Sequence, residues 1–165
     1  MFHRIVGLVA LLCLLTALTV APQVPGQTAE RTAVQDLDRR MLAFFGSLNT
    51  KAPKAGFDSI VKGGPLETNK GLEKILQQVQ AFDGKYGAFV EAELIRGTKV
   101  GKDLVILNYL YKSQKFPLVW RFVFYRTPTT VAATTPRPWH LVAVSFHTKL
   151  EQLDRLKVVQ QKNGT

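Results

Sequence analysis

The sequence predicts an α+β domain in which helices come first and a curved antiparallel sheet of about four strands follows. Up to residue 82, apolar residues recur at three- and four-residue steps, which is the spacing of one face of an amphipathic helix. From Tyr86 onward the spacing changes to two, which is typical of strands. Because a parallel α/β sheet needs helices and strands to alternate, this order indicates the α+β class.

The N-terminal segment predicts export. Arg4 supplies a positive charge, and residues 5–21 then contain no charged residue. A positive flank, an apolar run and small residues after it are typical of a secretory signal peptide. We therefore assign residues 1–26 to a leader and expect a periplasmic or extracellular protein. The alternative is an uncleaved anchor, because the run is only slightly shorter than the ~20 residues that span a bilayer. We expect membrane contact only in that case.

The residue types exclude several kinds of chemistry. The only cysteine, Cys13, lies inside the leader, so the rest of the chain has no disulfide, thiol nucleophile or thiolate metal site. The three histidines show no metal-ligand spacing, and the sequence contains neither a phosphate loop nor a nucleophile elbow. We expect no cofactor and no metal, and we assign no catalytic residue.

The net charge of +10 raises the question of nucleic-acid binding. Binders of this kind concentrate basic residues on one face and place aromatic rings to stack on bases. Here the lysines are scattered along the chain, and the aromatic residues alternate with apolar ones inside the predicted strands. We therefore expect a solvated basic surface and no specific nucleic-acid partner.

The helical half follows a flexible lead-in over residues 27–33 and opens a single domain over 34–160, with a tail at 161–165. The apolar face of the first helix comprises Val34, Leu37, Met41, Phe44, Phe45 and Leu48. Pro53 breaks this helix, and a short helix around Phe57 follows. Thr68 or Asn69 caps a third helix, which stops at Asp83 and Gly84.

The sheet half contains four predicted strands, at residues 88–96, 104–112, 118–125 and 139–148. The first strand places Phe89, Glu91 and Glu93 on one face and Val90 and Ala92 on the other. Hairpin loops lie at 97–103 and 113–117, and a longer loop covers 127–138. A terminal helix is expected over 150–159, where Leu150, Leu153 and Leu156 pack back onto the domain.

Strands that are apolar on both sides need cover on both sides. The helices supply one cover. A second layer, the terminal helix or a partner subunit could supply the other, so a homodimer through the sheet face is one expectation. Arg121 stands between Val119 and Val123, and we expect Glu91 or Glu93 to pair with it across the sheet, with capture of an anionic ligand as the alternative.

The fourth strand carries two of the histidines, His140 and His147. Their separation is odd, so a regular strand places them on opposite faces, where they cannot form a pair.

The order of helices and strands, together with residues 109–112, 117–125 and 139–142, resembles the nuclear transport factor 2-like superfamily. The resemblance is strongest to small secreted bacterial members with no assigned activity. It implies a cone-shaped fold over about residues 34–153. Members include isomerases, dehydratases and binding modules, so the fold alone does not select a function.

Two functional expectations follow. The first is a non-enzymatic exported domain that binds a small apolar ligand or a protein partner. The second is a small isomerase or lyase that works inside the cone with a carboxylate base and tyrosine donors, as steroid isomerases of the superfamily do. The catalytic residues of those isomerases do not map onto this chain. The candidate ligand-binding residues are Tyr109, Tyr111, Trp120, Arg121, Glu91 and His140.

Overall fold

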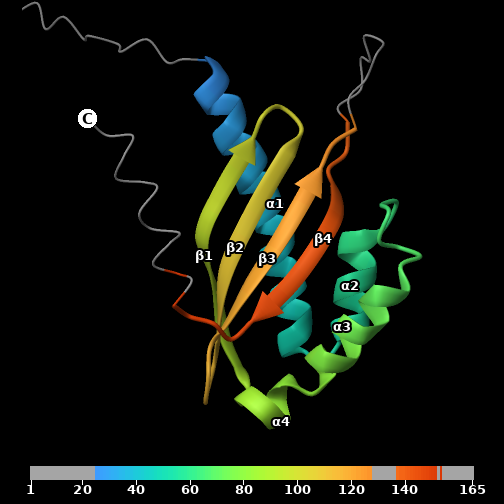
Figure 1. Cartoon of the computed structure of the whole chain (residues 1–165), viewed down its shortest axis with the longest axis vertical. Coiled ribbons are helices and arrows are strands. Elements are labelled where there is room, and N and C mark those ends of the chain that lie inside the picture. Colours follow the sequence, from blue (N-terminus) through green and yellow to red (C-terminus); the bar gives the residue numbers. More distant parts are fainter. Residues whose placement is uncertain (1–24, 128–136, 152, 154–165) are drawn as a thin grey trace, which may run out of the picture.

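The computed structural model describes residues 25–127, 137–151 and 153. Four helices come first: α1 (Pro25–Asn49), α2 (Pro53–Val61), α3 (Lys70–Gln80) and α4 (Phe82–Tyr86). Four strands follow: β1 (Phe89–Val100), β2 (Leu104–Ser113), β3 (Leu118–Tyr125) and β4 (His140–His147). The strands form one antiparallel sheet in the order β1-β2-β3-β4 (Figure 1). The predicted α+β class, with helices packed on an open four-stranded sheet, is confirmed.

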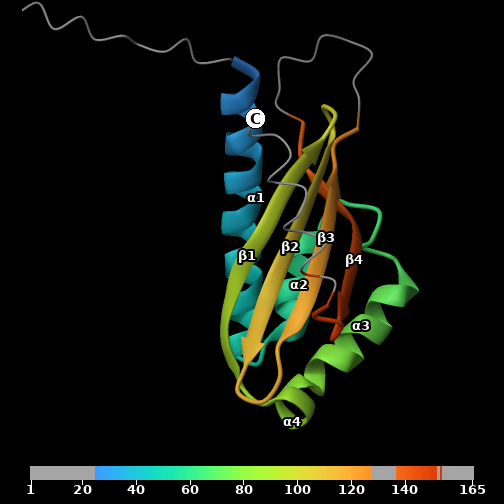
Figure 2. The ribbon, with the colours of Figure 1, turned by 60° about the vertical axis from the view of Figure 1, so that its left-hand side comes forward.

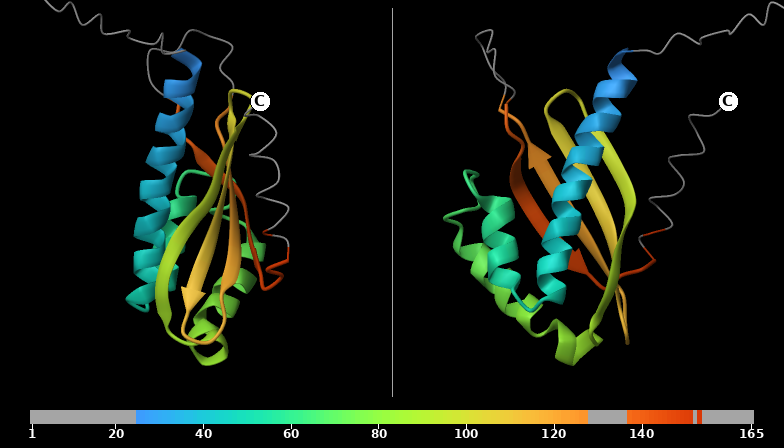
Figure 3. Two further views of the ribbon diagram at one scale, coloured as in Figure 1. Left: turned by 90° about the vertical axis from the view of Figure 1, so that its left-hand side faces the viewer. Right: turned by 180° about the vertical axis from the view of Figure 1, so that it is seen from behind.

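The helices cover one face of this sheet, which we call the inner face. Helix α1 crosses it obliquely, and α2 and α3 lie beside β4 (Figure 2; Figure 3, right). The opposite, outer face is turned toward the viewer in Figure 1, where the four labelled helices lie behind or beside the strands. The described helices therefore cover the inner face of the sheet but not its outer face.

Aromatic rings fill the space between α1 and the inner face. Phe44 of α1 meets Trp120 and Phe122 of β3 edge-on, with ring centroids 5.8 and 5.7 Å apart. Phe45 meets Tyr109 of β2 in the same way at 5.1 Å. Each edge-on pair adds about 0.5–1.5 kcal/mol beyond the burial of its apolar area. Because all five side chains are buried, the space between α1 and the sheet is a packed core.

The helices begin and end close to the expected positions, with two differences. Helix α1 already starts at Pro25, so residues 27–33 lie within the helix and not in a separate lead-in. Proline favours the first helical turn because its missing N–H is not needed there. After α3, a short helix α4 follows where the sequence predicts a stop. The predicted Asn69 cap is confirmed, since its side chain accepts a hydrogen bond from Gly71 N at 2.7 Å.

Irregularities in β1 change which residues share a face. The pairing with β2 shifts between Phe89 and Glu91 and again between Leu94 and Arg96. The extra residue, Val90, is exposed, and Phe89 turns to the inner face, where its ring lies 4.9 Å from that of Tyr111. The prediction that Phe89 shares a face with Glu91 and Glu93 is therefore wrong. A β-bulge reverses the alternation, and periodicity alone does not reveal one.

A second irregularity, in β4, corrects the prediction for the histidines. The register shifts between Val123 and Phe124 of β3, so β4 contains one extra residue there. His140 lies opposite Tyr125 and His147 opposite Val119, two positions on the same face of β3. The two histidines thus share a face and not opposite faces. They still form no pair, because six strand positions separate them by roughly 20 Å.

The prediction for Arg121 is also wrong. Arg121 is exposed on the outer face, and Glu91 and Glu93 pair with Lys112 instead. The arginine that lies among apolar side chains is Arg40 of α1. It donates hydrogen bonds to Ile60 O at 2.6 Å and to Trp139 O at 3.0 Å, and burial lowers its pKa. Ile60 O belongs to the last turn of α2, where the helix dipole favours a cation.

Several predicted segments lie outside the described residues: the leader up to residue 24, most of the 127–138 loop, most of the 150–159 helix and the 161–165 tail. Within the ranges that are described, no helix is both long and apolar enough to cross a bilayer.

Candidate functional site

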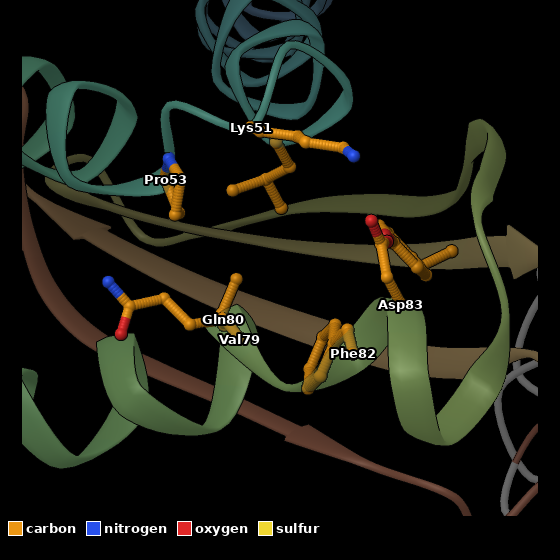
Figure 4. Close-up of a pocket in the computed structure, with 8 residues that line it drawn as sticks. Lys51, Pro53, Val79, Gln80, Phe82 and Asp83 are labelled. Atoms are coloured by element: carbon orange, nitrogen blue, oxygen red, sulfur yellow. The ribbon is translucent and has the colours of Figure 1, made fainter.

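A pocket of about 340 Å³ opens at the end of the domain where three helix ends meet β2. The end of α1, the start of α2 and the junction of α3 with α4 form its walls (Figure 4). It is lined by Leu48, Lys51, Pro53, Val79, Gln80, Phe82, Asp83 and Tyr111. Half of this lining is aliphatic or aromatic, and the other half carries two opposite charges, an amide and a phenol.

Lys51 takes its position from the way α1 ends. Its N–H donates to Leu48 O at 3.1 Å, and the N–H of Ala52 donates to Ser47 O at 2.9 Å. These two bonds form a Schellman motif, whose residue after the cap needs a left-handed conformation and is usually glycine. Lys51 has a φ of 57°. A side chain there costs roughly 1–2 kcal/mol relative to glycine.

Figure 4 shows Lys51 on the α1 side of the pocket, with Val79 and Phe82 on the opposite wall. Asp83 lies at one end of the same pocket. Neither of the two charged residues takes part in an ion pair within the described ranges of the chain. Both charges are therefore available to a bound molecule.

Tyr111 forms the strand-side part of the wall. Burial, and then the negative charge of Asp83, raises the pKa of Tyr111 to about 12. The phenol is protonated at neutral pH, as an ordinary tyrosine is, and can donate a hydrogen bond. A lysine cation, a protonated phenol and an amide on apolar walls can hold a small molecule with one polar end.

The structure separates the six predicted candidate residues. Only Tyr111 lines the pocket. Tyr109 and Trp120 are fully buried cross-strand neighbours in the core. Arg121 and Glu91 are exposed on the outer face. His140 is half-buried against the turn after α2, where a Cβ atom added to Gly64 would lie 3.3 Å from His140 Cβ.

Two polar clusters away from the pocket have structural roles. Asp103 accepts hydrogen bonds from Arg126 Nε at 3.3 Å and from Arg137 Nη2 at 3.1 Å. The guanidinium of Arg126 also lies 4.6 Å from the ring centre of Trp139. These contacts join the start of β2 to the end of β3 and the approach to β4. The second cluster is the pairing of Lys112 with Glu91 and Glu93, whose carboxylates are more than half exposed.

Sequence reasoning missed Lys51, Gln80 and Asp83. Lys51 stands in a predicted helix break, and Asp83 in a predicted helix stop, so both were assigned to connections. The order of the elements could have indicated these residues. The break after the first helix and the stop after the third helix lie at the same end of the sheet. In the described part of the chain, no group of three or more His, Cys, Asp or Glu residues could hold a metal.

Comparisons with models of known protein families, with curated proteins and with solved structures find no match to this chain.

Proposed function

We propose that this protein is an exported, non-enzymatic binding domain that holds a small, mainly apolar ligand in the pocket beside Lys51. The observation that carries the proposal is the make-up of that pocket, in which the apolar Leu48, Pro53, Val79 and Phe82 line the walls together with Lys51 and Asp83. Small-molecule sites combine a mostly apolar lining with a few polar groups that fix orientation. The volume of about 340 Å³ lies at the lower end of the ~300–1,000 Å³ range of such sites, so the ligand is small.

The conformation of Lys51 indicates the charge of the ligand's polar end. A lysine at a position that favours glycine weakens the domain, and such strain collects at functional sites. An ammonium group on the pocket wall compensates for this cost by binding an anion such as a carboxylate. Asp83, on the same rim, disfavours ligands that carry several negative charges.

Export rests on the leader at residues 1–26. The nuclear transport factor 2-like assignment rests on the order of helices followed by a four-stranded meander. The alternative function, an isomerase or lyase inside the cone, requires titratable groups that converge in a cavity between α1 and the sheet. The buried rings of Phe44, Trp120 and Phe122 occupy that space, so the packing disfavours this alternative.

Native mass spectrometry of the purified protein tests the proposal. We expect a fraction of molecules to carry an additional small mass that denaturation releases. Gln80→Trp fills the pocket from an exposed position of α3 and should abolish that mass, whereas Gln77→Trp, on the same helix outside the pocket lining, should retain it. The same bound mass in both variants would place the ligand elsewhere and refute the proposal.

A further inference from the structure

The turn between β1 and β2 carries an apolar side chain at its tip. Val100, the last residue of β1, pairs with Leu104 across the turn, yet its side chain is 49% exposed. Gly101 follows with a φ of 61°, and a Cβ atom on it would meet nothing within 4 Å. The turn therefore projects from the end of the sheet and presents Val100 to solvent.

Two lysines flank this tip. Lys99 precedes Val100, and Lys102 follows the turn glycine. Lys102 is exposed and Lys99 is half-buried. Neither lysine forms an ion pair in the part of the chain that the structure describes. Both ammonium groups can therefore meet an anion outside the protein.

Two arginines from the connection between β3 and β4 extend the positive charge. Arg126 donates to the backbone oxygen of Lys102 at 2.8 Å. Arg126 and Arg137 also donate to the same oxygen of Asp103, at 3.3 and 3.1 Å. Since one carboxylate serves two guanidinium groups, the basic side chains outnumber it and this region stays positive. We call this surface the basic end, and it comprises Lys99, Val100, Lys102, Arg126 and Arg137.

The basic end lies where the chain enters the domain. Gly97 of β1 approaches α1 so closely that an added Cβ atom would lie 2.4 Å from Val34 Cγ1. From this contact β1 runs on to Val100 and α1 runs back to Pro25, so both reach the same end of the domain (Figure 3). In the sequence, the uncharged run at residues 5–21 comes just before Pro25. A leader retained in a bilayer would therefore bring the basic end close to that bilayer.

We propose that the basic end docks on an anionic lipid surface, with Val100 inserted among the headgroups. Each lysine or arginine beside such a surface strengthens binding about fivefold. Apolar side chains of interfacial segments enter the headgroup region in the same way. Trp139 adds to this character, because its ring centre lies 4.6 Å from the guanidinium carbon of Arg126 and indoles favour the membrane–water interface.

A protein partner fits this surface less well. A stable protein interface buries about 800 Å² on each side, which is more than a single apolar tip supplies. Docking on lipid does not require a retained leader, because the charges and Val100 belong to the folded domain. It is also independent of the pocket ligand, since the pocket beside Lys51 lies at the opposite end of α1.

A fluorescent label on the tip tests the docking. In the full chain with Cys13→Ala, an environment-sensitive fluorophore is attached at Val100→Cys. The control carries it at Phe116→Cys, in the turn between β2 and β3, where Phe116 is 41% exposed. Vesicles contain equal parts of phosphatidylglycerol and phosphatidylcholine, or phosphatidylcholine alone. We expect the label at Val100 to require at least about tenfold less anionic than neutral lipid, and the label at Phe116 to respond to neither.

Charge variants identify the groups that hold the lipid. Lys99→Gln with Lys102→Gln should weaken the response of the tip label about 25-fold, because each lysine contributes about fivefold. Lys74→Gln with Lys115→Gln removes the same charge from exposed lysines elsewhere and should leave the response nearly unchanged.

Three results would overturn the proposal. An equal response of the two labels would show that the tip is not the part that enters the lipid. Equal weakening by the two lysine pairs would assign the binding to the overall charge of the protein. Binding of soluble polyphosphate as tight as that of vesicles, with unchanged emission of the tip label, would assign the basic end to polyanions in solution.

Discussion

Tyr109 on β2 donates a hydrogen bond to Asp38 on α1, with 2.6 Å between the phenol oxygen and the carboxylate oxygen. The tyrosine ring is fully buried, whereas Asp38 is half-buried. Burial, followed by this hydrogen bond, raises the pKa of Tyr109 well above its usual range. The bond adds a polar contact to the largely aromatic packing between α1 and the sheet, and it helps to fix the position of α1 along the strand.

Removing this tie should weaken the domain. Tyr109→Phe keeps the ring but leaves the half-buried Asp38 without its donor, which costs about 1–3 kcal/mol of unfolding free energy. Urea unfolding at pH 7 measures the difference. Asp36→Asn on the same helix is the control and should change stability by less than about 0.5 kcal/mol, because the pair of Asp36 with Arg39 is exposed. Equal effects of the two variants would show that the buried bond contributes nothing.

Stability should fall at alkaline pH because of Tyr111. Its pKa is raised from an ordinary 10.0 to about 12 in the folded protein. A raised pKa contributes stability that is complete below pH 10 and is lost as the pH rises toward 12. At pH 11 the loss amounts to about 1 kcal/mol for this phenol. Tyr111→Phe should therefore lose less unfolding free energy between pH 8 and pH 11 than the unmodified chain does. If the unfolding free energy declined equally in both proteins, titratable groups other than Tyr111 would cause the loss of stability.

Two glycines should respond to alanine in opposite ways. A Cβ atom on Gly97 of β1 would lie 2.4 Å from Val34 Cγ1 of α1, whereas one on Gly46 of α1 meets nothing within 4 Å. Valine is stiff at χ1 and cannot turn away easily. Gly97→Ala should therefore destabilise the protein by about 1–3 kcal/mol. Gly46→Ala should stabilise it by about 0.5–1 kcal/mol, because glycine is a poor helix former. Thermal unfolding measures both. An unchanged stability of Gly97→Ala would contradict the close approach to Val34, and destabilisation by Gly46→Ala would contradict the open space beside Gly46.

Two substitutions at Lys51 separate backbone strain from binding. Lys51→Gly should stabilise the protein by about 1 kcal/mol, because glycine adopts the left-handed conformation freely. Lys51→Ala removes the same charge but keeps the strain, so its stability should be unchanged. Both variants should bind octanoate at least tenfold more weakly than the unmodified chain, as isothermal titration calorimetry would show. If only one of the two variants bound octanoate more weakly, the positive charge of Lys51 would not be what binds the ligand.

The sequence could predict the fold class and the core because both follow from local periodicity. Phe44, Phe45 and Trp120 stand at regular helix or strand positions, and they are buried as their spacing indicates. The faces of β1 and β4 could not be predicted in the same way. Strand β1 contains two extra residues and β4 contains one, and the position of such a bulge depends on how neighbouring strands fit together.

The pocket escaped prediction for a related reason. Lys51 stands in the connection after α1 and Asp83 in the short helix α4, and only the packing of the helices against the sheet brings these two segments together. Arg121 shows the converse error. Its apolar neighbours in sequence suggested burial, yet the outer face leaves its side chain exposed. Arg40 of α1 is half-buried, and helical spacing alone does not distinguish it from its exposed neighbour Arg39.

An NMR titration of the labelled protein with octanoate and with octylamine tests the central claim most directly. The two probes share an apolar tail and carry opposite charges. We predict that octanoate shifts the amide signals of Lys51, Val79 to Asp83 and Tyr111 in a saturable way, and that octylamine binds at least tenfold more weakly. Gln80→Trp should abolish the shifts. Octanoate shifts that map to the outer face of the sheet, or that persist unchanged in Gln80→Trp, would contradict the account.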